Sequence, residues 1–246
     1  MRRIEGVAIG LVVEVDARLA RVRVRFPWME PPVDSFWAPI ASLLAGKKRG
    51  ARFMPEIGDE ALIAFDRGQF DHPYVVGFLW NGVDEAPDSV VTNRLIVTPG
   101  GHELRFEDKD GDRRIVIKTA GAHKVALDDK AKSITVESTQ GHRLEILDGD
   151  GTVTLATKNG GKVTLGNVPG TAVVEASQNR VSLGPGGITI EVGTGTAISV
   201  TAPVVNVSAA MTSFSGVVQA STIMAGTVIT SAVVSNSYTA GIGNLV

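Results

Sequence analysis

Three histidines recur at nearly regular intervals in the middle of the chain: His102, His123 and His142 lie 21 and 19 residues apart. Imidazole is a common metal ligand, and in an assembly of several chains around one axis these residues could form stacked rings of ligands. Each histidine also begins a repeat beside a turn, a position that requires no ligand. We therefore predict no metal site and no cofactor.

Acidic residues cluster around the same segments, and paired carboxylates are the groups that cleave glycosidic bonds. The clusters are Glu107-Asp108, Asp110, Asp112, Asp128-Asp129 and Asp148/Asp150. Asp-Gly and Asp-Lys pairs at strand ends are typical of turns. We predict no catalytic residue and no enzyme; a trimeric β-helical tailspike enzyme that cleaves cell-envelope polysaccharide is the alternative.

One stretch is distinctly basic, with Lys47, Lys48, Arg49 and Arg52. A basic loop on a barrel could bind single-stranded nucleic acid if aromatic side chains stacked on the bases, but Phe53 and Trp37 are poorly placed for that. The chain has 24 Lys and Arg against 26 Asp and Glu, whereas nucleic-acid binders usually carry a basic excess. We expect no nucleic-acid partner; a protein contact and a solvated loop both stay open.

The first 82 residues read as short strands separated by turns. Apolar residues alternate with arginines in Ala20–Phe26, where Val22, Val24 and Phe26 share one face. The expected strands are residues 7–15, 20–26, 35–40, 53–65 and 74–80. Five short strands in about 80 residues are typical of a small closed barrel. The apolar run near the N-terminus contains Glu5, Glu14 and Asp16, so no signal peptide is expected.

From residue 100 onward a repeat appears. Gly101, Gly121, Gly141 and Gly161 are spaced by 20 residues, and couples of apolar residues two positions apart recur about every ten residues, from Leu104/Phe106 onward. Two apolar side chains per strand form a face too thin for one copy of the chain to offset its conformational entropy. Such strands become stable by stacking, either in a solenoid or with several chains around one axis.

The 55 residues after Glu191 contain no Asp, Glu, Lys or Arg. A membrane span needs about 20 predominantly apolar residues in a row, and here Ser, Thr, Asn and Gly interrupt every few positions. The abundance of Val, Ile and Thr indicates stacked β-structure instead.

The first 82 residues resemble the oligosaccharide/oligonucleotide-binding (OB) barrel of contractile-tail spike proteins, which include phage baseplate assembly protein V, the central spikes of contractile phages and the valine–glycine repeat spikes of type VI secretion. The matching stretches are ARVRVRFPW (20–28), SFWAPIAS (35–42) and the block from Ala45 to Gly82, followed by the β-repeat. The resemblance implies an all-β chain with an OB barrel at 1–82, a linker at 83–101 and a shaft at 102–246, charged over 102–195 and uncharged over 196–246. It also implies a homotrimer whose shafts intertwine as a triple-stranded β-helix.

The function implied by the resemblance is structural: a spike at the centre of a baseplate that punctures a cell envelope, with transient membrane contact. The chain begins directly with the barrel, so we expect a separate hub protein at that end, facing Lys47, Lys48, Arg49 and Arg52. This favours the baseplate of a phage virion or of an extracellular phage-tail-like injection particle over type VI secretion. No His-x-His iron site follows His142, and a PAAR-like tip protein is expected to dock on Ile242, Leu245 and Val246.

Overall fold

The structure, a computed structural model, describes residues 3–167, 170–194 and 197–231, and the chain divides into two units at residue 196. Nearly all regular structure in the described residues is β; the exception is a short 3₁₀ turn, Asp66–Gly68. No helix in those residues is long and apolar enough to cross a membrane. The strands of the N-terminal part are β1 (Val7–Asp16), β2 (Arg21–Phe26), β3 (Val33–Asp34), β4 (Ala38–Pro39), β5 (Ala45–Gly46), β6 (Arg49–Gly50), β7 (Glu60–Phe65) and β8 (Pro73–Phe78).

The N-terminal strands form a barrel in the order β3-β2-β1-β7-β8, and β4 also pairs with β2. Closure comes from the end of β4. Ile40 forms a parallel bridge with Val75 of β8, and the Ala41 amide donates a 2.8 Å hydrogen bond to the Val75 carbonyl. The prediction of a closed five-strand barrel is confirmed, with the third strand split into the short β3 and β4.

The alternation of β2 decides which side chains form the barrel core. Val22, Val24 and Phe26 are completely buried, whereas the arginines between them point outward. Each arginine pairs with a carboxylate on the barrel surface: Arg21 with Asp16, Arg23 with Glu14 and Arg25 with Asp34. Phe26 lies against the rings of Phe65 and Phe70, with centroids 6.0 and 5.7 Å away.

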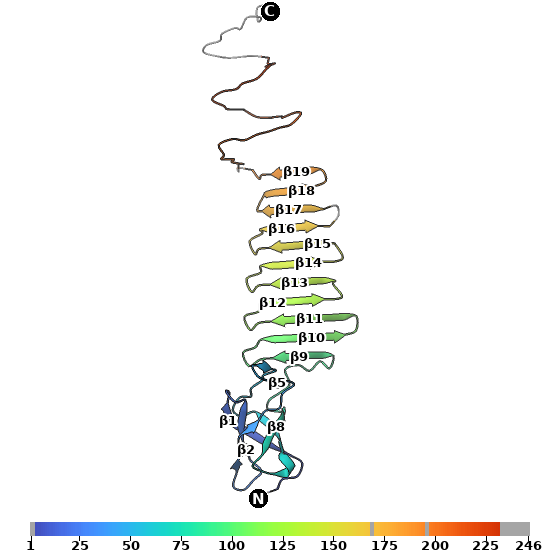
Figure 1. Cartoon of the computed structure of the whole chain (residues 1–246). Helices are drawn as coiled ribbons and strands as arrows, with labels where there is room; N and C mark the ends of the chain where they lie inside the picture. Colours follow the sequence, from blue (N-terminus) through green and yellow to red (C-terminus); the bar gives the residue numbers. More distant parts are fainter. Residues whose placement is uncertain (1–2, 168–169, 195–196, 232–246) are drawn as a thin grey trace, which may run out of the picture. The chain divides into compact units, whose positions relative to one another are not determined.

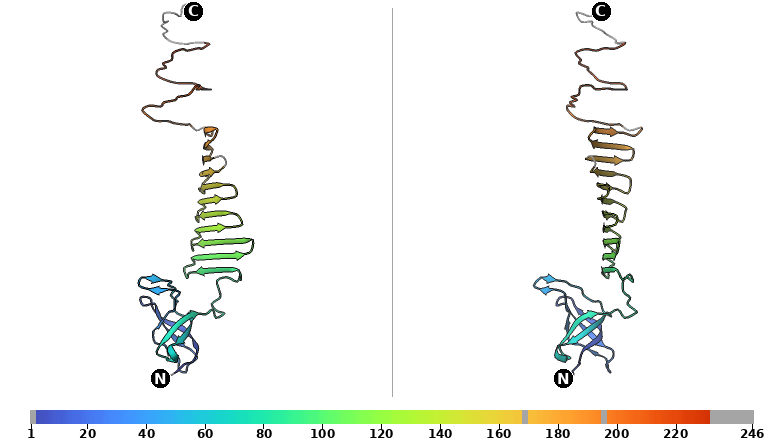
Figure 2. Two further views of the ribbon diagram at one scale, coloured as in Figure 1. Left: turned by 45° about the vertical axis from the view of Figure 1, so that its right-hand side comes forward. Right: turned by 90° about the vertical axis from the view of Figure 1, so that its right-hand side faces the viewer.

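The repeat forms one antiparallel sheet in which the strands follow one another in chain order (Figure 1). The two views in Figure 2 show a single layer that twists along its length, as sheets of L-amino acids do. The strands are β9 (Asn93–Val97), β10 (Glu103–Lys109), β11 (Asp112–Lys118), β12 (Lys124–Asp128), β13 (Ser133–Glu137), β14 (Arg143–Leu147), β15 (Thr152–Ala156), β16 (Lys162–Gly166), β17 (Thr171–Ala176), β18 (Asn179–Gly184) and β19 (Gly187–Glu191).

The sheet confirms the all-β class and the position of the repeated strands, and it adds β9 within the stretch 83–101 that was expected as a linker. Every strand from β10 to β18 finds both of its hydrogen-bonding neighbours in its own chain. The intertwined triple-stranded β-helix therefore stays a prediction, because the strands from β10 to β18 already have both backbone neighbours within one chain.

The stacked β-structure predicted for the uncharged end is not formed by residues 197–231 of the single chain, which contain no strand. Apolar side chains in this segment are widely exposed, for example Val205, Val207 and Phe214. A strand needs a neighbour to satisfy its backbone groups, and along these residues the single chain supplies none.

Candidate self-association surface

Two columns of apolar side chains run along one face of the β9–β19 sheet. Directly paired residues on antiparallel strands point to the same face, so the strand register joins the apolar couples into columns. One column is Ile96, Leu104, Ile117, Val125, Val136, Leu144, Leu155, Val163, Val174, Val181 and Ile190; the other is Phe106, Ile115, Leu127, Ile134, Ile146, Val153, Leu165, Ala172, Leu183 and Ile188. We call this surface the apolar face.

The apolar face is uncovered in the single chain. Val136 keeps 41% of its surface exposed, Leu155 55% and Ile188 71%. Soluble monomers rarely expose a continuous apolar patch larger than a few hundred Å². A surface that runs over eleven strands therefore indicates a protein contact.

The other face of the same sheet is mostly polar. Its central row contains mainly hydroxyl and charged side chains, together with two valines and one alanine: Arg105, Val116, Ala126, Thr135, Glu145, Thr154, Thr164, Val173, Ser182 and Thr189. A neighbouring row places Lys124 opposite Glu137 and Lys162 opposite Glu175, and opposite charges at such positions favour the sheet. This face suits contact with water.

The three histidines stand at turns along one edge of the sheet, as the sequence indicated. Each backbone N–H of these residues donates to a hydroxyl four residues earlier: His102 to Thr98, His123 to Thr119 and His142 to Ser138, at 3.0 to 3.1 Å. The residue before each histidine has a positive φ, which Gly101 and Gly141 adopt without strain, while Ala122 adopts it at 65°. The turn role predicted for these histidines is confirmed.

No group of three or more His, Asp or Glu side chains converges as metal ligands would within residues 3–167, 170–194 and 197–231. Asp148 and Asp150 lie exposed in the turn after β14.

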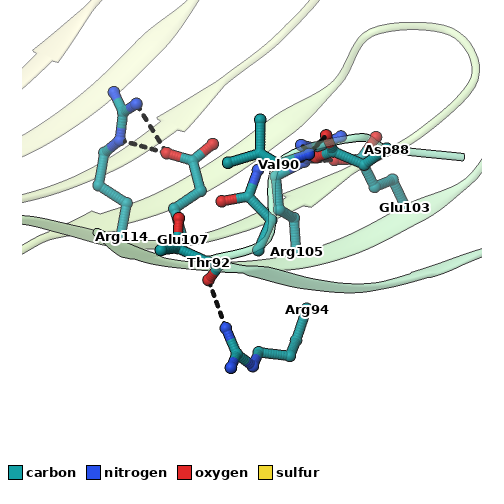
Figure 3. Close-up of polar contacts among 9 residues, drawn as sticks. Asp88, Val90, Thr92, Arg94, Glu103, Arg105, Glu107 and Arg114 are labelled. Carbon is teal, nitrogen blue, oxygen red and sulfur yellow. Dashed lines mark hydrogen bonds and ion pairs between the residues drawn. The ribbon is translucent and has the colours of Figure 1, made fainter.

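A polar anchor, missed by the sequence analysis, fastens the segment before β9 to the sheet. Asp88 accepts hydrogen bonds from the Val90 amide at 2.8 Å and the Asn93 side chain at 2.7 Å, and it pairs with Arg105, which also pairs with Glu103. Figure 3 shows Asp88, Arg105 and Glu103 gathered at one point, beside the separate Arg114–Glu107 pair. The available signal was Asp88 two residues before Val90, the spacing of an Asx turn.

The anchor shifts the titration of its carboxyl groups. The Asn93 hydrogen bond, the Val90 amide and the Arg105 charge hold the pKa of Asp88 below its ordinary value, and the hydrogen bond from Arg105 lowers the pKa of Glu103. A carboxyl with a lowered folded-state pKa stabilises the fold above its unfolded pKa, near 4, and loses that contribution as the pH falls through the folded value. The anchor should therefore hold at neutral pH and weaken below about pH 4.

Asp88→Ala is expected to detach the segment before β9 from the sheet. The donors Val90, Asn93 and Arg105 would lose the carboxylate that accepts their hydrogen bonds. Backbone amides from Val90 to Asn93 should exchange with solvent faster on the order of tenfold, since hydrogen bonds to a charged acceptor are among the stronger ones. Hydrogen-exchange mass spectrometry at pH 7 measures this. Asp110→Ala, at an exposed turn, is the control and should leave these amides unchanged; equal exchange in both variants would rule out the anchor.

The basic stretch forms the small hairpin β5–β6, with Lys47 and Lys48 at its turn. Lys47, Lys48, Arg49 and Arg52 are exposed, and Arg52 also donates a 3.1 Å hydrogen bond to the carbonyl of Ala17. The structure thus leaves all four basic residues exposed. The tip residues Ile242, Leu245 and Val246 lie outside the described residues.

Residues 8–80, which span β1 to β8, match the family of the type VI secretion system/phage-baseplate injector OB domain. The barrel topology and this match agree. The chain is a relative of the contractile-tail spike proteins.

Spike proteins of type VI secretion resemble the chain over two-fifths to one half of its length. The spike protein VgrG4b of Pseudomonas aeruginosa is 32% identical over 113 residues, which cover 41% of the chain and 14% of that protein. VgrG3 of Vibrio cholerae is 28% identical over 109 residues, covering 39% and 11%, and VgrG1b of Pseudomonas aeruginosa is 27% identical over 137 residues, covering 50% and 17%. The matches therefore span less than a fifth of these relatives.

Proposed function

We propose that this spike relative is a structural homotrimer at the centre of the baseplate of a contractile phage tail or phage-tail-like injection system, where it links a hub protein to a tip protein and punctures a cell envelope. The observation that best supports this proposal is the uncovered apolar face of the sheet. This sheet follows, in the sequence, a barrel that matches the injector OB domain. The proposal involves no catalytic step.

The trimer we infer over residues 93–191 consists of three sheets with their apolar faces turned toward one axis. Backbone groups of β10 to β18 are satisfied within each chain, so the three chains associate through side chains here. Burying apolar surface contributes about 25 cal/mol per Å², and each strand adds two side chains to the interior. Intertwining of the chains is proposed only for the uncharged part beyond residue 196.

The proposed partners follow the two ends of the chain. The hub protein would contact the barrel end through Lys47, Lys48 and Arg49 of the β5–β6 hairpin and through Arg52, close in sequence to the exposed Leu43. The tip protein, of the PAAR kind, would dock on Ile242, Leu245 and Val246. A rod held together by hydrogen bonds along its axis resists compression, which suits a part that a contracting tail pushes through an envelope. We also propose that the barrel ends at residue 82, the linker at 101 and the charged part of the shaft at 195.

Two measurements test the proposal together. Native mass spectrometry of the full chain should give three times the 25.8 kDa of one copy. In the producing cell, deletion of the chain should abolish complete contractile particles in electron micrographs, with restoration by the unaltered chain. A stable monomer, or normal particles without the chain, would contradict it.

A further inference from the structure

Three of the histidines are each followed by an aspartate at the same spacing. His102 precedes Asp108 by six residues, His123 precedes Asp129 by six, and His142 precedes Asp148 by six. His123 and Asp129 flank β12, His142 and Asp148 flank β14, and His102 precedes β10, in which Asp108 is the last residue but one. The histidine stands at the start of its strand and the aspartate at the end, so the two types gather on opposite edges of the sheet.

Both edges belong to the apolar face. His102 and Asp108 have the parity of Leu104 and Phe106, and the same holds for the other two pairs, because side chains two positions apart share a face. Backbone hydrogen bonds between neighbouring strands continue to both edges of the sheet. The Thr119 amide donates to the His123 carbonyl at 2.9 Å on one side, and the Asp148 amide donates to the Lys132 carbonyl at 3.0 Å on the other.

The two edges are exposed and chemically complementary. All six side chains are exposed in the single chain. At the edge that carries the histidines, the intervening strands β11 and β13 are followed directly by the hydroxyl residues Thr119 and Ser138. At the edge that carries the aspartates, the same two strands begin beside cations: Arg113 is the second residue of β11, and Lys132 directly precedes β13. We call these the histidine edge and the aspartate edge.

The intramolecular partners of the six side chains are weak or missing. The Nδ1 atoms of His102 and His123 accept long hydrogen bonds of 3.4 Å from the amides of Ala120 and Thr139. Asp108 lies 3.6 Å from Arg94. No ion pair joins Asp129 or Asp148 to another side chain in the parts of the chain that the structure describes.

The later repeats lose both members of the pair together. At β16 the corresponding positions are Gly161 and Asn167, and at β18 they are Asn179 and Pro185. Turn geometry at one edge places no demand on the residue at the other edge, about 20 Å away along an extended strand. Joint retention and joint loss indicate that the two edges meet, which requires a second copy of the chain.

We propose that the histidine edge of each chain contacts the aspartate edge of the next copy, level by level, so that an interchain His–Asp ladder sets the register of the three sheets. The inference rests on the proposed trimer. A threefold rotation about an axis along the strand stacking moves no residue along that axis, so β12 of one copy lies level with β12 of the next. The three contacts are head to tail and close the ring.

The ladder also disfavours wrong registers. A slip by one strand would bring His123 of one copy to the level of a cation on the next, Arg113 or Lys132, in place of Asp129. Specific interfaces use such repulsive alternatives as well as favourable contacts. A featureless apolar face would tolerate slipped registers, because its two columns change little from strand to strand.

Interchain cross-linking tests the ladder directly, since the chain has no cysteine. The variant His123→Cys with Asp129→Cys should oxidise to a covalent trimer on a denaturing, non-reducing gel. The two cysteines of one copy are too far apart to join each other, because a disulfide requires Cα atoms within about 7 Å. The control His123→Cys with Asp148→Cys places the partner two strands, about 9.6 Å, off level, and should stay largely uncross-linked.

Native mass measured in parallel separates the two proposals. A native trimer that cross-links equally in both variants, in the control alone or in neither overturns the ladder and leaves the trimer standing, whereas a native monomer overturns both. A charge exchange gives an independent readout. Asp129→Lys should lower the melting temperature of the trimer, and adding His123→Glu should restore at least half of the loss; no restoration counts against the ladder.

Discussion

Two glutamates on the apolar face of β13, in the variant Ile134→Glu with Val136→Glu, are expected to convert the proposed trimer into monomers or aggregates. Both side chains are about two-fifths exposed in the single chain, so the folded monomer loses little. In the trimer, six carboxylates would meet near the axis without partners. Burying an unpaired charge costs several kcal/mol, which exceeds what the neighbouring apolar contacts at one level contribute. Native mass spectrometry and sedimentation measure the loss.

The matched control is Ser133→Glu with Thr135→Glu, which places the same charge on the same strand but on the opposite face. This variant should remain trimeric. If both double variants dissociate alike, strand instability is the cause and the apolar face is not the interface. If both stay trimeric, the sheets associate by another surface.

Phe26→Ala is expected to destabilise the barrel by about 3–5 kcal/mol, the usual cost of removing a buried phenylalanine. Phe26 is completely buried and contacts Trp28, Phe65 and Phe70. Trp28, Trp37 and Trp80 all precede the repeat, so tryptophan fluorescence during denaturant unfolding reports the barrel separately from the shaft.

Phe53→Ala serves as the control, because Phe53 is 61% exposed. Exposed substitutions usually change the free energy of unfolding by less than about 0.5 kcal/mol. An equal loss in the two variants would mean that the aromatic cluster around Phe26 is not the stabilising core of the barrel.

Local alternation was enough to predict most of the barrel and the repeat. Val22, Val24 and Phe26 read as one face from spacing alone, and the apolar couples from Leu104/Phe106 onward located the strands. This works because side-chain direction in a strand has a period of two, which makes the buried face a property of neighbouring residues. The turn role of His102, His123 and His142 followed from the same periodicity.

Local alternation could not predict contacts between residues that are far apart in the sequence. Asp88 meets Arg105 across 17 positions, and β9 is recognisable as a strand through its pairing with β10. The register of neighbouring strands, which places His123 and Asp129 on opposite edges of the apolar face, likewise appears with the folded sheet. Residues 197–231 form no strand in one chain, although their composition predicted stacked β-structure. Contacts along the chain are encoded in adjacent residues, whereas contacts between segments depend on how the backbone hydrogen bonds align them.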